Sequence, residues 1–258
     1  MPTERLEDLP PAAELFDYRE SDEGGVPLWL PHNQGDVFAG MELSPLTGED
    51  ATGAAMLFLH PCTMRDRTGQ LVPRATVVAV QPRSAKKPLD DPHNWDKRYF
   101  VIPLPDFSGR GNDSCEANMF HMGSVPHDAL SREKRVAVFS EIGRAHMLHR
   151  IIFHLTRKSV PTEVLLRATR HVQAELQLQG DWTLAAWERF GGLSNEQVEA
   201  VEAEFTSMFY GPWPEAAQTG GDTIRDRLYS EREAEHEEAF ALVSEMCGSD
   251  VPGSCLKP

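Results

Sequence analysis

The chain has 258 residues, of which 40% are hydrophobic and 25% are charged, and its formal net charge is −15. This composition is ordinary for a globular protein, and no apolar run approaches the roughly 20 residues that a membrane-spanning helix needs. The first residues are acidic and lack the apolar stretch of a secretory signal, and the four cysteines include no C-x-x-C pair. We therefore expect free thiols and a cytoplasmic protein, although a disulfide between Cys247 and Cys255 stays open.

The acidic residues are concentrated at the two ends of the sequence. Residues 1–30 carry eight acidic and two basic side chains, residues 194–258 carry fourteen and four, and residues 31–193 are almost neutral. A negative surface repels the phosphates of nucleic acids and attracts basic proteins. Solubility alone would also account for such charges, so a partner-binding role and a merely solvated surface both remain open.

Residues 1–139 are predicted to be a loose acidic arm followed by short strands. Residues 1–30 are rich in proline, glycine and charge, and we expect their apolar patch, Leu28–Leu30, to cover one edge of a sheet. Apolar segments bounded by turn residues then predict strands at 35–43, with a bend or bulge at Gly40, and at 55–60, 75–80, 98–104, 116–125 and 135–139. Short strands at this spacing favour a small barrel.

Helical periodicity begins at Ser140, which is a good N-cap, and continues to the C-terminal region. We expect helices from Ser140 to about Lys158, from Pro161 to Gly180, from Trp182 to Phe190, after the capping box Ser194–Gln197, and from about Asp222 to Met246. The last helix is almost wholly charged over residues 231–238. It is therefore expected to project from the protein or to pack only at its ends.

Several segments, in this order along the chain, resemble the MazF/PemK toxin family. They are Gly35-Asp36-Val37, Ser44-Pro45, Met56–Leu59, Val77–Ser84, Gly123–Val125 and the helix Ser140–Arg157. The resemblance covers about residues 35–157 and implies an SH3-like barrel closed by a helix. The predicted fold is therefore α+β, a small SH3-like β-barrel followed by a helical C-terminal extension. Its three regions are an arm (1–30), the barrel with its closing helix (31–158) and the extension with its acidic last helix (159–258).

The resemblance also implies a possible activity, because these toxins cut single-stranded RNA with an arginine before the second strand and a hydroxyl residue after a later one. Ser84 matches the hydroxyl position and has Arg83 beside it, but residues 51–55, directly before Met56, include no arginine. Cleavage needs a cation that stabilises the pentacoordinate phosphate. A ribonuclease interpretation therefore requires Arg65 or Arg67 to reach the same pocket.

Other motifs give weaker signals. His60-Pro-Cys62 is typical of a strand end rather than of a metal site, because no second ligand pair has a recognisable spacing. His146, His149 and His154 share a helix without forming H-E-x-x-H. The sequence contains no Walker A loop, no G-x-G-x-x-G and no G-x-S-x-G, so we expect no cofactor and no metal.

Two charged sets are candidates for binding. The basic set surrounds an aromatic residue and consists of Arg65, Arg67, Arg83, Lys86, Lys87, Trp95, Lys97 and Arg98. Such a set can hold a nucleic-acid single strand by charge and stacking. The acidic set consists of Glu231, Glu233, Glu235, Glu237 and Glu238, and it could dock on a basic protein. A solvated surface is the alternative for both.

The sequence therefore favours a non-enzymatic regulatory or adaptor protein of bacterial or phage origin. Its partner would be a protein, such as a basic recombinase or nuclease that processes DNA or RNA. We expect no binding to a membrane. Two alternatives stay open: an endoribonuclease of the MazF/PemK type, and a single-stranded nucleic-acid binder.

Overall fold

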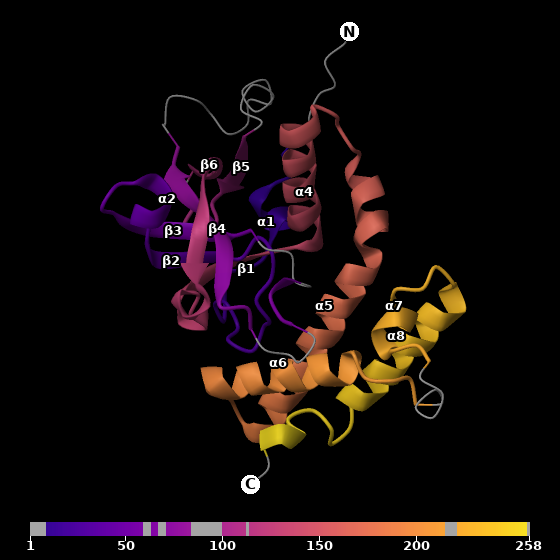
Figure 1. The fold of residues 1–258 in the computed structure, drawn as a ribbon. Helices are drawn as coiled ribbons and strands as arrows, with labels where there is room; N and C mark the ends of the chain where they lie inside the picture. Colours follow the sequence, from indigo (N-terminus) through magenta and orange to yellow (C-terminus); the bar gives the residue numbers. More distant parts are fainter. Residues whose placement is uncertain are drawn as a thin grey trace. The chain divides into compact units, whose positions relative to one another are not determined.

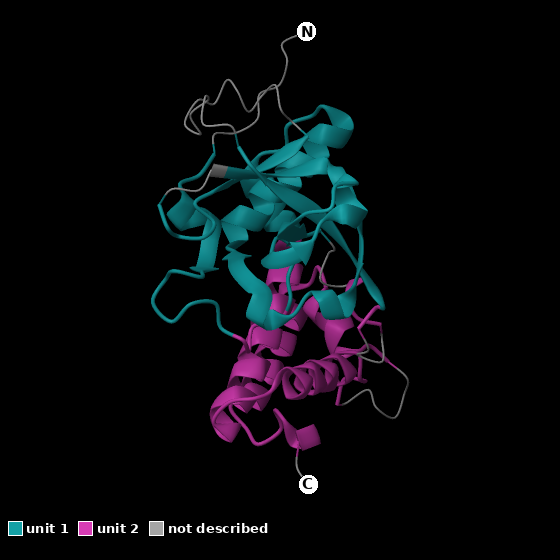
Figure 2. Ribbon diagram, turned by 90° about the vertical axis from the view of Figure 1, so that its left-hand side faces the viewer, with its two compact units in different colours: residues 1–27, 32–61, 73–168 teal, residues 28–31, 62–72, 169–258 magenta. Residues whose placement is uncertain are grey.

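The computed structural model describes residues 9–58, 63–66, 71–83, 100–111, 114–214 and 221–256 (Figure 1). The protein is 46% helical and 24% strand, which confirms the predicted mixture of helices and strands. The chain forms two compact units (Figure 2). Unit 1 comprises residues 1–27, 32–61 and 73–168, and unit 2 comprises residues 28–31, 62–72 and 169–258.

Unit 1 is built on one curled antiparallel sheet, a half-barrel of seven strands within the described residues. The strands are β1 (Phe16–Arg19), β2 (Val37–Glu42), β3 (Thr52–Leu57), β4 (Arg74–Pro82), β5 (Val101–Pro105), β6 (Ser114–Pro126) and β7 (Arg135–Phe139). Their spatial order is β1-β7-β2-β3-β4-β6-β5. Six of these strands confirm segments predicted from the sequence, with ends that differ by a few residues. The pairing register of β2 shifts between Phe38 and Met41, and Gly40 between them has a φ of 64°, which confirms the predicted irregularity.

The N-terminal region contributes more order than its composition indicates. Residues expected to belong to a loose arm form the short helix α1 (Ala12–Leu15) and the edge strand β1. Leu15 and Phe16 are 1% and 6% exposed, and Phe16 pairs with Phe139 of β7. Burial of these two apolar side chains outweighs the surrounding charge. Residues 28–31 belong to unit 2 and β1 belongs to unit 1, so the expectation that Leu28–Leu30 cover the sheet edge stays a prediction.

Short helical segments connect the strands, and α4 (Glu141–Thr156) follows the last of them. Among the described residues, these segments include α2 (Ser44–Thr47) and the 3-10 turns η2 (His127–Ala129) and η3 (Arg132–Lys134). The predicted N-cap of α4 is confirmed, since the Ser140 side chain accepts a hydrogen bond of 3.0 Å from the Gly143 amide. Met147 of α4 joins the core that Met56, Val78 and Ile102 of the sheet form.

Helix α5 (Thr162–Phe190) is continuous, so the predicted interruption at Gly180 is wrong. Glycine inside a helix costs roughly 0.5–1 kcal/mol relative to alanine. That cost is offset by a buried stripe at intervals of four residues, Leu178, Trp182 and Ala186, which packs into the core of unit 2. The division between the two units falls inside this helix, between Ala168 and Thr169.

The C-terminal helices of unit 2 are α6 (Asn195–Phe209), α7 (Ile224–Leu228), α8 (Glu233–Cys247) and the turn η4 (Ser254–Leu256). Both hydrogen bonds of the predicted capping box at Ser194 are present. The single helix expected over 222–246 is wrong, because a corner at residues 229–232 separates α7 from α8. Ala239 and Val243 in the middle of α8 are fully buried, so α8 packs along its length and not only at its ends. Cys247 and Cys255 are free thiols, so the disulfide that the sequence allowed between them does not form.

Candidate functional site

The structure places two of the four residues that a ribonuclease site would use. Arg83 follows β4 in unit 1 and is 8% exposed. Arg65 belongs to unit 2, where its guanidinium forms an ion pair with Glu202 of α6, and the two side chains are 11% and 3% exposed. Arg67 and Ser84 lie outside the described residues. The Arg65 charge is therefore balanced by a buried carboxylate. The two residues are 137 positions apart in the sequence, so the sequence alone did not predict this pair.

Of the basic set, the described residues include only Arg65 and Arg83. Lys86, Lys87, Trp95, Lys97 and Arg98 lie outside the described residues, and the His60-Pro-Cys62 motif does too. The set as a nucleic-acid-binding surface therefore stays a prediction.

The Gly35-Asp36 pair of the family resemblance has a structural explanation in unit 1. Gly35 has a φ of 94°, and a Cβ atom there would lie 2.3 Å from the Phe139 ring, so only glycine fits. Asp36 accepts hydrogen bonds from Arg135 (3.1 Å) and from the Asn33 amide (3.0 Å), and both side chains of the ion pair are 0% exposed. Burial raises the pKa of Asp36, and Arg135 opposes that shift. The motif thus joins the start of β2 to β7.

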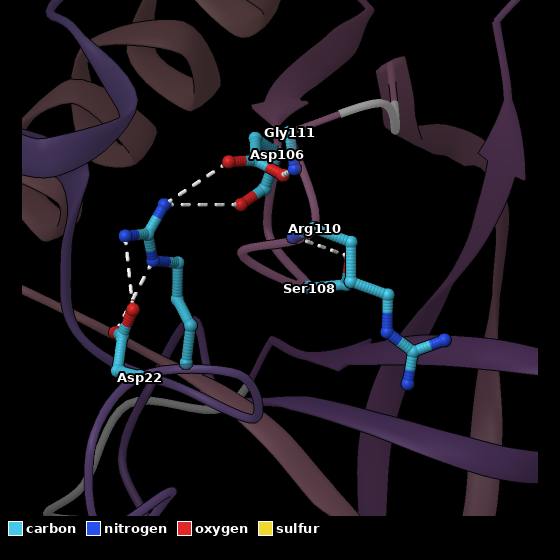
Figure 3. A network of polar contacts seen from close by, with 6 residues as sticks. Asp22, Asp106, Ser108, Arg110 and Gly111 are labelled. Carbon is cyan, nitrogen blue, oxygen red and sulfur yellow. Dashed lines mark hydrogen bonds and ion pairs between the residues drawn. The ribbon is translucent and has the colours of Figure 1, made fainter.

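A second network in unit 1 fixes the turn after β5 (Figure 3). Arg19 of β1 donates to both carboxylate oxygens of Asp22 (3.2 and 3.0 Å) and to Asp106 (3.3 Å). Asp106 has a φ of 44°, and its other carboxylate oxygen accepts a 2.6 Å hydrogen bond from the Gly111 amide. Two carboxylates share the single positive charge of Arg19, which therefore links Asp22 to Asp106. It joins the edge strand β1 to the β5–β6 turn and is structural.

The acidic set around α8 divides into paired and unpaired members. Glu233 pairs with Arg170 of α5 (3.1 Å), Glu235 with Arg232 (2.8 Å) and Glu238 with Arg227 of α7 (3.2 Å). Hydrogen bonds from Ser230 and Arg232 lower the pKa of Glu235, so this carboxylate is ionised at neutral pH. These three glutamates are thus held within unit 2.

The remaining two members, Glu231 and Glu237, are exposed and form no ion pair with any described residue. Glu237 lies eight residues before Glu245 on the outward face of α8, with exposed Ala241 between them, while Ala239 and Val243 face the core. Glu245 also forms no ion pair within the described part of the chain. Glu231 lies in the corner before α8, and we call Glu231, Glu237 and Glu245 together the acidic stripe.

Sequence reasoning missed Glu245 and the arginine partners of α8. Two steps of four residues lead from Glu237 through Ala241 to Glu245, and positions four apart share a helix face. This spacing would have indicated Glu245. The Arg232–Glu235 pair was also visible as an i, i+3 spacing. Arg170 and Arg227 lie on other helices, so only the tertiary structure brings them to Glu233 and Glu238.

Comparison with protein-family models and with curated proteins finds no match to this sequence. The residues and their geometry are therefore the basis for a functional assignment. Within the described ranges, no helix is long and apolar enough to cross a membrane, and no group of three or more His, Cys, Asp or Glu side chains is arranged to hold a metal ion.

Proposed function

We propose that this chain is a non-enzymatic regulatory or adaptor protein that binds a basic protein partner through the acidic stripe of unit 2. The observation that carries the proposal is that Glu231, Glu237 and Glu245 are exposed and in no ion pair with a described residue, whereas their neighbours on α8 are internally paired. The surrounding residues 194–258 carry fourteen acidic and only four basic side chains. An unneutralised negative surface attracts a positive one and accelerates its encounter.

The partner class follows from the sign of the charge. Enzymes that process nucleic acids carry clusters of lysine and arginine where phosphates bind. A carboxylate surface can dock on such a cluster and repels the nucleic acid itself. We therefore propose a recombinase or nuclease of a bacterial or phage system as the partner, in the cytoplasm.

The test compares two variants of the full chain that have the same net charge. The first removes the acidic stripe through Glu231→Gln, Glu237→Gln and Glu245→Gln. The matched control removes three exposed glutamates of α5 and α6 that also form no described ion pair, through Glu188→Gln, Glu196→Gln and Glu199→Gln. Each protein is used as bait in native lysate, and bound protein is quantified at low and moderate salt.

We expect the wild type and the control to recover a stoichiometric basic partner, and the stripe variant to lose it. Binding through exposed charges also weakens as salt rises. Equal recovery by the two variants would refute the acidic stripe as the binding surface, and recovery of the bait alone in every case would refute the adaptor function.

A second proposal concerns unit 1, whose curled half-barrel and closing helix α4 support an SH3-like fold of the MazF/PemK type with endoribonuclease activity as the alternative function. Arg83 at the end of β4, directly before Ser84, favours this alternative. Its test is incubation with single-stranded RNA of the wild type and of Arg83→Ala and Ser84→Ala.

Arg65 needs a different variant in that assay. Its loss alone would remove the positive charge that faces the buried Glu202 carboxylate, which costs about 3–5 kcal/mol. The pair should therefore be replaced together, as Arg65→Met with Glu202→Leu. Absence of RNA cleavage, or cleavage that survives all of these variants, rules the proposed site out. Binding of single strands without cleavage, weakening steeply with salt, would instead support the nucleic-acid-binding alternative.

A further inference from the structure

Two histidines meet at the corner between α7 and α8. His171 of α5 and His236 of α8 each direct Nδ1 at the carbonyl oxygen of Leu228, at 2.9 and 2.6 Å. The two Nδ1 atoms are 3.4 Å apart, and the ring centroids are 5.1 Å apart with the rings at 75°. One carbonyl at the end of α7 therefore joins three helices of unit 2.

The contacts define the protonation state of His171. A carbonyl oxygen can only accept, so the Nδ1 atoms of both rings carry hydrogen. The Nε atom of Arg170 lies 3.3 Å from His171 Nε2 and can only donate. His171 Nε2 must therefore be without a proton, which makes His171 a neutral imidazole of the Nδ1–H tautomer.

Charged groups surround this pair from all three helices. On α5, Arg170 contacts His171 and also pairs with Glu233 of α8. At the end of α7, the Tyr229 ring stacks on His171 with centroids 5.7 Å apart, and its hydroxyl donates a 2.5 Å hydrogen bond to Glu175. Arg225 of α7 lies 4.2 Å from the centre of the same tyrosine ring, and its Nε is 3.9 Å from Glu175.

The balance of these groups opposes a positive charge on His171. Partial burial lowers the pKa of His171, and Arg170 and His236 lower it further, whereas the Leu228 hydrogen bond and Glu233 act in the opposite direction. Burial also raises the pKa of Glu175, against the effects of Tyr229 and Arg225. Glu175 already interacts with Tyr229 and Arg225, and Glu233 is already paired with Arg170. These two carboxylates therefore do not compensate for a second cation beside Arg170.

We propose that His171, His236 and the Leu228 carbonyl form a proton-sensitive latch that holds the N-terminal half of α8 against α5 and α7 at neutral pH and releases it on acidification. Protonation of His171 places an N–H on Nε2, directly opposite the Nε–H of Arg170, so that contact is lost. Displacement of Arg170 also weakens its pair with Glu233, which is the first residue of α8.

The direction of the pH dependence follows from the lowered pKa of His171. The unfolded or opened state takes up the proton first, near the ordinary value of about 6.5. The latch therefore stabilises the closed position of α8 fully above about pH 6.5. This stabilisation is lost as the pH falls below that value and through the pKa of His171 in the closed state. The regulatory consequence, weaker partner binding in acid, rests on the proposed function, because the released segment carries Glu231 and Glu237.

The test measures amide hydrogen exchange of α8 in the free protein, corrected for the intrinsic effect of pH. Because the opened state takes up the proton first, protection of residues 235–239 should fall as the pH is lowered from about 7.5 to about 5.5. The variant His171→Asn with His236→Asn keeps a donor near the position of Nδ1 and cannot titrate. It should lose this pH dependence, whereas the control His154→Asn in unit 1 should retain it.

Equal pH dependence in the wild type and the double asparagine variant would overturn the latch. If that variant does not fold, nitrogen NMR of the wild type gives a second test. The latch requires the neutral Nδ1–H tautomer of His171 at about pH 7.5, and the Nε2–H tautomer or a cation at that pH would overturn it. Neither measurement involves a partner, so failure of the latch is distinguishable from failure of the adaptor function.

Discussion

Burial of His146 makes a specific prediction about acid stability. This residue lies on α4 in unit 1, where it is 3% exposed, and its Nε2 has no hydrogen-bond partner among the described residues. Burial, with smaller effects of Arg150 and His149, lowers its pKa to about 3. An ordinary imidazole in the unfolded chain takes up a proton near pH 6.5. The neutral folded state is therefore favoured fully above that pH, and this advantage is lost as the pH falls from about 6.5 towards about 3.

The magnitude follows from the linkage between proton uptake and folding. Each pH unit in this window lowers the free energy of unfolding by about 1.4 kcal/mol, so acidification from about pH 6.5 to about pH 5 should cost about 2 kcal/mol through His146 alone. The variant His146→Leu removes the titrating group and replaces it with an apolar side chain that does not bind a proton. Its stability should therefore fall by about 2 kcal/mol less than that of the wild type over the same range.

The assay is urea unfolding of both proteins at about pH 7 and about pH 5, with the change in free energy of unfolding compared between them. Other titrating groups cancel in that comparison, because both proteins carry them. The variant His121→Gln serves as a control, since it removes a histidine that is only partly buried on β6 and hydrogen bonded to Gln81. If His146→Leu and the wild type lose the same stability between the two pH values, the burial argument for His146 is wrong.

Three further predictions concern unit 2, each measured as the free energy of unfolding in urea. Gly180→Ala should stabilise the protein by about 0.5–1 kcal/mol, because the residue is inside a helix and a Cβ atom there meets nothing within 4 Å; destabilisation would show that the site is crowded. Ser194→Ala should cost about 1 kcal/mol through loss of the α6 capping box, and Ser194→Asp should recover most of it. Glu204→Ala should cost about 2–3 kcal/mol and expose the C-terminal turn to proteolysis. The Glu204 carboxylate accepts hydrogen bonds from Trp182 (3.2 Å) and the Gly253 amide (2.7 Å), among others. An unchanged stability would contradict this role.

Local signals predicted much of the secondary structure. The N-cap at Ser140 and the capping box at Ser194 were readable because a cap and the amide that it accepts from are three residues apart. The bulge at Gly40 was readable for a similar reason, since a left-handed backbone conformation favours glycine wherever it occurs. Each of these features depends on neighbours in the sequence.

The errors arose where packing outweighed local preference. Gly180 and the charge of residues 231–238 indicated helix ends or a projecting helix, but buried stripes on α5 and α8 determine where those helices run. The candidate site was only partly readable for the same reason. The charges of Glu231–Glu238 were visible, but which of them are neutralised depends on Arg170 and Arg227, which lie on other helices.

The sequence by itself determined the mixture of strands and helices, the positions of most strands, and the concentration of acidic residues at the two ends, because these properties depend on composition and short-range periodicity. Only the tertiary structure decided which charges remain available. It pairs Arg65 with buried Glu202, encloses the Asp36–Arg135 pair, and leaves Glu237 exposed on the outward face of α8. The physical reason is that an ion pair and the burial that modifies it depend on distances between residues remote in sequence, and those distances exist only in the folded chain.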